Sequence, residues 1–322
     1  MKKSGIGAAL ALLAGLGVAA VPARAAEPLV AVTSIVDHPA LNAVHEGVKE
    51  ALAKAGFEDG KTVSLAFESA QGQPATAVQI ARKFVGDKAA VIVAISTPSA
   101  QAAAAATKTI PVVFSAVTDP VTAQLVKSVE KPGGNVTGVS DMAPIGDQLA
   151  LIRELSPQAK TIGVLFNPGE VNSIAAIESL KKAAKELDFT VVEAPATKTS
   201  EAQGAARSLA GKADVAFVPT DNTIVSALEA VAGALQAAKI PLYAADTDSV
   251  ARGALASVGF NYHQLGLQTG DLVVRILKGE KPGDLPVSFA TGTDLYLNKA
   301  VAGKIGVTLP EAALKRAVKV IE

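Results

Sequence analysis

One stretch of the chain occurs twice in similar form. Residues Val30–Phe57 and Ile162–Phe189 have equal length, and each reads as a strand, a polar loop and an amphipathic helix. The match resumes in two shorter stretches farther along each half, Arg82–Gly86 with Arg207–Gly211 and Ile110–Phe114 with Ile240–Ala244. Two copies are too few for a solenoid, which stacks at least three units. The repeat therefore predicts two similar lobes with a ligand cleft between them.

Apolar runs rich in valine and isoleucine alternate with amphipathic stretches along both halves. This alternation is typical of βαβ units, whose parallel sheets are buried on both faces. Strands are expected at Leu29–Ser34, Thr62–Glu68, Val91–Ile95, Val112–Ala116, Thr161–Phe166, Thr190–Glu193, Val215–Pro219 and Leu242–Ala245. Helices are expected at Pro39–Ala55, Pro74–Val85, Ser99–Thr107, Ile174–Leu187, Ser200–Ala210 and Ser226–Ala238. The predicted fold class is α/β, with two doubly wound, Rossmann-like lobes.

The last part of the chain is expected to return to the first lobe. The helix Tyr262–Leu277 and the segment Leu285–Leu297 follow the second copy and need a sheet to cover. Each lobe is therefore predicted to consist of two segments. The first lobe takes residues 26–141 and 258–290, and the second takes residues 142–257 and 291–322.

The first 25 residues have the pattern of an export signal. Lys2 and Lys3 precede an apolar run from Ile6 to Val21, and Ala23 and Ala25 supply the small residues of a cleavage site. The run is shorter than the roughly 20 residues that span a bilayer. Because the chain has no cysteine, it offers no lipid attachment site and no disulfide. We expect a soluble periplasmic protein without a lipid anchor.

The charge balance argues against nucleic acid as a partner. Removing Lys2, Lys3 and Arg24 with the leader leaves a net charge of about −3 from 30 basic and 30 acidic residues. Nothing in the sequence implies a cofactor, and a monomer is expected.

Polar loops follow the predicted strands at the edge where ligands bind open parallel sheets. That edge also presents helix N-termini, with free N–H groups and partial positive charge. The candidate ligand-binding residues in these loops are Ser34, Asp37, His38, Thr97, Ser99, Gln101, Thr118, Asp119, Asn167, Glu170, Asn172, Ser173, Thr220, Asp221, Asn222 and Asp246. Several of these side chains also suit a purely structural role, because Ser, Thr, Asn and Asp cap helices and form turns.

Catalytic and metal-binding motifs are not recognisable. The sequence contains no GxSxG elbow, no GxxxxGKS/T loop, no GxGxxG after a strand and no HExxH pair. Asp37, Glu170 and Asp221 could form an acid/base pair only if the fold set two of them at a suitable separation. We therefore expect neither an enzyme nor a metal site.

Several short motifs resemble a known family. They are Asp37–Leu41, Thr118–Pro120, Asn135–Ser140, Asn167–Ser173, Pro219–Asn222 and Leu277–Pro282. Together they make the chain similar to periplasmic substrate-binding proteins of ABC transporters, in the subgroup with tryptophan- and tyrosine-type members, from about Val30 to Pro310. The resemblance implies the type I periplasmic binding protein fold, in which a three-strand hinge joins the lobes. It also implies delivery of a small ligand to membrane permease subunits.

The loop chemistry favours a zwitterionic ligand. Thr97, Ser99 and Thr118 offer neutral donors for a carboxylate, and Asp221 or Asp246 offers a partner for an ammonium group. The chain has no tryptophan and only 4% aromatic residues, so a small aliphatic or polar amino acid, or a related carboxylated amine, is expected. A sensor that docks on a signalling receptor is the alternative, and a periplasmic enzyme is a remote one.

Overall fold

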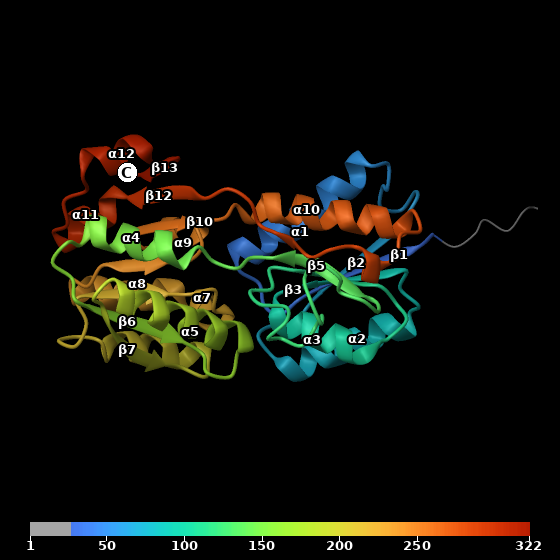
Figure 1. Ribbon diagram of the computed structural model, residues 1–322, viewed down its shortest axis with the longest axis horizontal. Helices are drawn as coiled ribbons and strands as arrows, with labels where there is room; N and C mark the ends of the chain where they lie inside the picture. Colours follow the sequence, from blue (N-terminus) through green and yellow to red (C-terminus); the bar gives the residue numbers. More distant parts are fainter. Residues whose placement is uncertain (1–26) are drawn as a thin grey trace, which may run out of the picture.

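The computed structural model describes residues 27–322, so the predicted leader lies outside the described part of the chain. Two α/β lobes lie side by side along the long axis of the molecule (Figure 1). This arrangement confirms the predicted fold class. Every helix within residues 27–322 is too short or too polar to cross a membrane.

The first lobe is built around a six-stranded sheet in the order β11-β5-β4-β3-β1-β2. All of its strand pairs are parallel. Its strands are β1 (Leu29–Ser34), β2 (Ser64–Ser69), β3 (Val91–Ile95), β4 (Val112–Ser115), β5 (Val136–Ser140) and β11 (Ser288–Phe289). Its helices are α1 (Pro39–Lys54), α2 (Pro74–Gly86), α3 (Thr97–Ala106), α10 (Tyr262–Leu277) and the short 3-10 turn η2 (Pro282–Asp284).

The second lobe has a seven-stranded sheet in the order β13-β12-β10-β9-β8-β6-β7. Its strands are β6 (Thr161–Phe166), β7 (Thr190–Pro195), β8 (Val215–Val218), β9 (Leu242–Ala244), β10 (Ala256–Gly259), β12 (Asp294–Asn298) and β13 (Lys319–Ile321). Its helical elements are α4 (Ile145–Leu155), α5 (Val171–Glu186), η1 (Thr199–Glu201), α6 (Ala202–Arg207), α7 (Asn222–Ser226), α8 (Leu228–Ala237), α9 (Asp248–Ala251), α11 (Lys299–Ile305) and α12 (Glu311–Arg316). Strand β12 departs from the expected parallel pattern, because it runs antiparallel to β10.

The two sheets share one inner order. Strands β5-β4-β3-β1-β2 of the first lobe correspond to β10-β9-β8-β6-β7 of the second. The repeated segments of the sequence form β1 with α1 and β6 with α5. The internal repeat is therefore a repeat of topology as well as of pattern.

Three segments join the lobes, between β5 and α4, between β10 and α10, and between β11 and β12. The expected boundary between residues 257 and 258 falls inside β10. Val258 and Gly259 pair with β12 in the second sheet, so the chain leaves that lobe after Gly259. The chain passes from the second lobe to the first two residues later than expected, because Val258 and Gly259 still belong to the second sheet.

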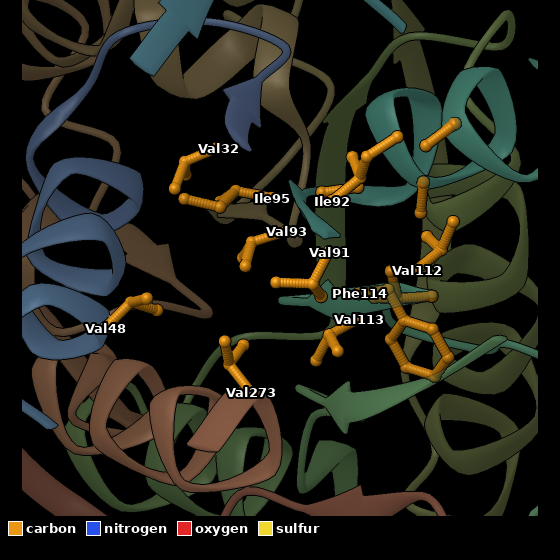
Figure 2. Packing of buried hydrophobic residues seen from close by; sticks show 14 of the residues in the cluster. Val32, Val48, Val91, Ile92, Val93, Ile95, Val112, Val113, Phe114 and Val273 are labelled. Atoms are coloured by element: carbon orange, nitrogen blue, oxygen red, sulfur yellow. The ribbon is translucent and has the colours of Figure 1, made fainter. Parts of the chain in front are cut away.

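The core of the first lobe is a layer of branched aliphatic side chains between sheet and helices. Val48 of α1 and Val273 of α10 face the valines of the central strands (Figure 2). Residues Val91–Ile95 of β3 are wholly buried, which explains why this strand reads as a continuous apolar run. At about 1.5–3 kcal/mol for each large aliphatic side chain, this layer dominates the stability of the lobe.

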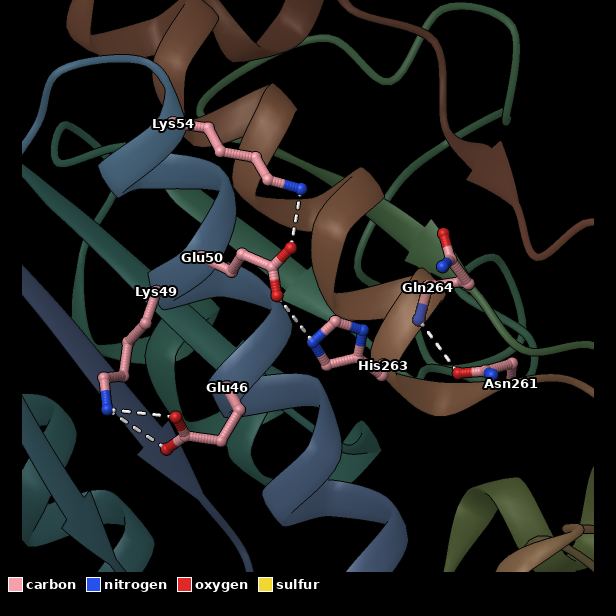
Figure 3. A network of polar contacts seen from close by, with 7 residues as sticks. All are labelled: Glu46, Lys49, Glu50, Lys54, Asn261, His263 and Gln264. Carbon is pink, nitrogen blue, oxygen red and sulfur yellow. Dashed lines mark hydrogen bonds and ion pairs between the residues drawn. The ribbon is translucent and has the colours of Figure 1, made fainter.

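Helices α1 and α10 approach each other closely through glycines. A Cβ on Gly47 would lie 2.3 Å from the carbonyl oxygen of His263, and a Cβ on Gly266 would lie 2.2 Å from that of Val44. At the rim of this contact, Glu50 of α1 pairs with Lys54 at 2.6 Å and with His263 of α10 at 3.1 Å (Figure 3). The Glu50–His263 contact joins α10 to α1, the first helix of the described chain.

Candidate functional site

A cavity lies between the lobes, beside the hinge. Its internal volume is about 20 Å³, room for about one water molecule, so its lining residues close tightly around it. Loops after β1, β3, β4 and β5 form one side, and loops after β6, β8 and β9 form the other. The lining residues are His38, Ala40, Leu41, Ser96, Ala116, Thr118, Asp141, Asn172, Thr220, Asp221, Asn222, Val225, Asp246 and Tyr262.

A wider outer cleft of about 910 Å³ opens farther from the hinge. Its walls include Gln101 of the first lobe and Asn167 and Glu170 of the second. Asn222 lines both the cavity and the outer cleft, so it stands at the boundary between them.

Two hydrogen bonds join the lobes at the cavity. Ser96 Oγ donates to Asn222 Oδ1 at 3.0 Å, and Thr118 Oγ1 lies 3.0 Å from Thr220 Oγ1. Thr118 also donates to Asp141 Oδ1 at 3.1 Å, so Thr220 is the donor in the Thr118–Thr220 contact. The lobes are therefore in contact around the cavity.

The loops of the first lobe carry unusual backbone angles where they line the cavity. Ser96 follows β3 with φ of 78°, and Ala116 follows β4 with φ of 53°. Left-handed φ in residues other than glycine costs about 1–3 kcal/mol and is concentrated at functional sites. These two positions turn the chain sharply at the carboxyl ends of the central strands.

Asp221 combines a structural role with a place on the cavity wall. It caps α7 by accepting from Ile224 N at 2.7 Å, and it also accepts from Asn167 N and Ser173 Oγ, both at 2.6 Å. Burial, and then the nearby carboxylate of Glu170, raise the pKa of Asp221 to about 7. Three donors leave this carboxyl little capacity for a ligand.

Glu170 is held inside the second lobe by neutral donors. It accepts from the backbone N–H groups of Asn222 and Thr223, from the side chains of both residues, and from Asn172 Nδ2. These five bonds compensate for the burial of its charge. Glu170 therefore fixes the first turn of α7, and with it the Asn222 side chain that reaches Ser96.

Asp246 and Asp141 lie on the cavity wall with acceptor capacity left. Asp246 accepts from Ser249 N at 2.8 Å and from Ser249 Oγ at 2.6 Å. Asp141, in the first hinge segment, accepts from Thr118 and from Tyr262 OH at 2.9 Å. Burial raises the pKa of both carboxyls, and the charge of Asp246 adds to the rise at Asp141. Both would be stabilised as anions by a cation in the cavity.

His38 enters the cavity as a neutral ring. It is the N-cap residue of α1, and its Nδ1 is 3.5 Å from the N–H of Leu41. Burial, followed by the charge of Arg252, lowers the pKa of His38 to about 3, and Asp37 opposes this shift. A neutral His38 supplies a polar edge and no charge.

The candidates from the sequence separate into three groups. Those that line the cavity are His38, Thr118, Asn172, Thr220, Asp221, Asn222 and Asp246. Those on the outer cleft are Gln101, Asn167 and Glu170, together with Asn222. The remaining ones contribute to neither lining, namely Ser34, Asp37, Thr97, Ser99, Asp119 and Ser173.

The third group has local roles. Ser34 donates to Val36 O, Asp37 accepts from Gln71, and Asp119 caps a turn at Val121 and Thr122. Thr97 and Ser99 are buried in the first turn of α3, where neither hydroxyl has a hydrogen-bond partner. Ser173 is bound to Asp221.

Sequence reasoning missed Asp141 and Tyr262. Asp141 lies in the first hinge segment, and Tyr262 is the first residue of α10, directly after the second, so the rule that inspects loops after the strands of one βαβ unit does not reach them. Their positions follow Ser140 and Gly259, where the chain changes lobe. Ser96 and the apolar lining residues Ala40, Leu41, Ala116 and Val225 were also not among the candidates.

Comparison with known proteins gives a consistent family. A family model described as "ABC transporter substrate binding protein" matches residues 29–321. A curated protein of Clostridioides difficile (strain R20291), named "Tyrosine-binding protein", is 45% identical over 270 residues, which are 84% of this chain and 78% of that protein.

Two solved structures are also similar. A domain from Streptococcus pneumonia in complex with L-Trp has 38% identity and a TM-score of 0.89, covering 92% of this chain and 100% of that one. A ligand-free, open substrate binding protein with adhesive properties from Clostridium difficile has 43% identity but a TM-score of 0.70, covering 91% and 99%. Together with the two bonds across the cleft, the better match to the complex indicates that the lobes are closed here.

Proposed function

Because this chain belongs to the ABC transporter substrate-binding protein family, we propose that it captures an amino acid between its lobes and delivers it to the permease of an ABC importer. The family consists of solute-binding proteins, which confirms the expectation of a non-enzymatic role. We also propose that residues 1–25 direct the protein to the periplasm, where it works as a monomer.

One observation carries the amino-acid assignment. The wall of the cavity contains two buried carboxyls with free acceptor capacity, Asp246 and Asp141, and none of its 14 lining residues is lysine or arginine. An ammonium group needs several acceptors when it leaves water, and this wall provides them. For the carboxylate of the ligand the wall offers the ring N–H of the neutral His38, whose Nδ1 accepts from Leu41 N.

We propose an aromatic side chain for the ligand, in place of the small one that the composition favoured. One similar protein is named as tyrosine-binding, and the structure of another is in complex with L-Trp. Support from this chain comes from the ring of Tyr262 and the apolar side chains of Leu41, Ala116 and Val225 on the same wall. Although the whole chain has few aromatic residues, the ring of Tyr262 lies on the cavity wall, where an aromatic ligand would contact it.

Binding measurements test this function. Titration calorimetry of residues 26–322 with L-tyrosine, L-tryptophan, L-leucine and L-serine should give heat for the aromatic pair. A ligand at 100 times its Kd should also stabilise the fold by about 2.7 kcal/mol. Binding of leucine or serine but of neither aromatic amino acid would show that the ligand is a small aliphatic or polar amino acid. If all four amino acids fail to bind, the amino-acid assignment is overturned.

A pair of variants tests the carboxyl assignment. Asp246→Asn should weaken binding by about 2–5 kcal/mol, because the ammonium loses a charged partner inside the closed cavity. Asp119→Asn is the matched control, since Asp119 only caps a local turn that asparagine also caps. Equal affinities of the two variants would remove Asp246 from the site.

A further inference from the structure

Asn172 lines the cavity and has a buried side-chain oxygen without a hydrogen-bond partner. The residue is 4% exposed, and its Oδ1 is buried with no hydrogen bond. Its Nδ2 donates to Thr220 O at 2.7 Å and to Glu170 Oε2 at 3.1 Å. Because both of these partners are acceptors, turning the amide over would set oxygen against oxygen. The orientation is thus fixed, and the unsatisfied atom is an acceptor.

A buried acceptor without a partner is costly, and because Asn172 lines the cavity, a ligand bound there can supply the missing donor. The two carboxyl groups on the same wall are further acceptors. Both Asp246 and Asp141 are acceptors as anions, and each has about two acceptor sites left after its present bonds. This side of the cavity therefore demands several N–H donors at once.

We infer that Asn172 Oδ1 accepts one N–H of the ligand's ammonium, and that with Asp246 and Asp141 it selects an unsubstituted primary ammonium. This inference rests on the proposed function and adds a specificity determinant to it. A primary ammonium carries three N–H donors, enough for one bond each to Asn172, Asp246 and Asp141. A secondary ammonium keeps its charge but has only two, so one of the three acceptors stays unpaired in the closed cavity.

The ligand class that follows is defined at the amine end. Amino acids with a free α-ammonium bind, and their N-methyl derivatives are rejected although their net charge is unchanged. Deletion of the amine, as in indole-3-propionate, leaves the acceptor wall with no donor at all and abolishes binding. Charge alone does not separate amino acids from their N-methyl derivatives, because Asp246 and Asp141 attract primary and secondary ammonium groups alike.

The experiment measures Kd for L-tryptophan and N-methyl-L-tryptophan, and for the corresponding tyrosine pair, on three proteins. These are the wild type, Asn172→Ala and Asn172→Asp. The aspartate variant keeps an acceptor but loses the donor to Glu170 and Thr220, whereas the alanine variant loses both. Urea unfolding of each variant reports whether the second lobe remains folded.

The wild type should prefer the primary amine by about ten-fold or more. Asn172→Ala should bind L-tryptophan more weakly and reduce the preference to within about three-fold, because the third acceptor is gone. Asn172→Asp should keep the preference. A preference retained by Asn172→Ala assigns the side chain only to holding Glu170 and Thr220, and overturns the inference.

The wild-type ligand pair tests the inference even if both variants unfold. Equal affinity of the wild type for the primary and N-methyl forms contradicts it while leaving the proposed function intact. Absence of binding by either parent amino acid overturns the aromatic assignment itself, which is a different result.

Discussion

Asp221 shows how one buried residue can look like a ligand partner and still act mainly within the fold. Its carboxyl lies on the cavity wall, yet its bonds to Ile224 N, Asn167 N and Ser173 hold α7 and the loop after β6 together. Asp246 differs because its oxygens have one donor each. The number of existing donors, rather than burial or residue type, separates the two roles.

The stability of the protein should depend on pH through Asp221. Its pKa is near 3.8 when unfolded and about 7 when folded, so its contribution is fully present below pH 4 and is lost as pH rises through 7. Relative to Asp221→Asn, the wild type should lose unfolding free energy between about pH 4 and pH 7. Urea unfolding across this range measures the difference.

The difference between the two proteins is the informative quantity, because His38 acts in the opposite direction. Its pKa falls from 6.5 to about 3 on folding, so its contribution is lost as pH decreases from 6.5. This effect is common to wild type and variant and cancels. Parallel pH profiles would show that Asp221 does not titrate in this range.

How far the site could be predicted depends on where each residue lies in the chain. The rule about carboxyl ends of strands found His38, Thr118 and Asp246, because each follows a strand of a recognisable βαβ unit. Asp141 and Tyr262 needed knowledge of where the chain changes lobe. The left-handed backbone of Ser96 and Ala116 could not be predicted, because neither residue type signals it.

At the scale of elements, the periodicity of the sequence predicted most helices and strands, whereas the ends of the helices were predicted less accurately. Gly56 follows α1 with φ of 84°, as a helix-ending glycine should. The helix expected at Pro74–Val85 ends one residue later, at Gly86, and Lys88 takes the left-handed position beyond it. Helix α4 was not predicted, because it starts directly after a hinge segment and has no capping side chain.

The glycines between α1 and α10 lead to a prediction about packing. Gly266→Ala should destabilise the protein by about 1–3 kcal/mol, because the new methyl group would clash with the backbone of α1. Gly233→Ala in α8 is the control. It has no atom within 4 Å of the added Cβ and should stabilise its helix by about 0.5–1 kcal/mol.

Chemical denaturation of both glycine variants gives the comparison directly. If Gly266→Ala is as stable as Gly233→Ala, the two helices are farther apart in solution than in this structure, and α10 is free to shift along α1.

At the scale of the whole molecule, closure depends on a few polar contacts near the hinge. Ser96 with Asn222 and Thr118 with Thr220 connect the lobes, and Glu170 keeps Asn222 in place. When the lobes separate, water can satisfy all four side chains. The net contribution of each bond is therefore modest, about 0.5–1.5 kcal/mol, which allows the ligand to decide the equilibrium.

Removing one of these contacts between the lobes should lower the affinity for every ligand by the same factor. Ser96→Ala should lower affinity by about five-fold for both L-tyrosine and L-tryptophan, since it destabilises the closed form rather than a ligand contact. Ser226→Ala is the control, because Ser226 bonds to Asn222 O within the second lobe. Calorimetry gives the affinities, and small-angle scattering should show a more open ligand-free form for Ser96→Ala only.

The discontinuous first lobe has a consequence for biosynthesis. Its sheet begins with β1, but the helix that packs on α1 through Gly266 is α10, and the strand that completes its edge is β11. A growing chain therefore exposes the apolar face of α1 until Leu277 has been made. Any truncation of the carboxyl end that removes α10 takes away the packing partner of α1, so the lobe that is begun first completes its packing late in synthesis.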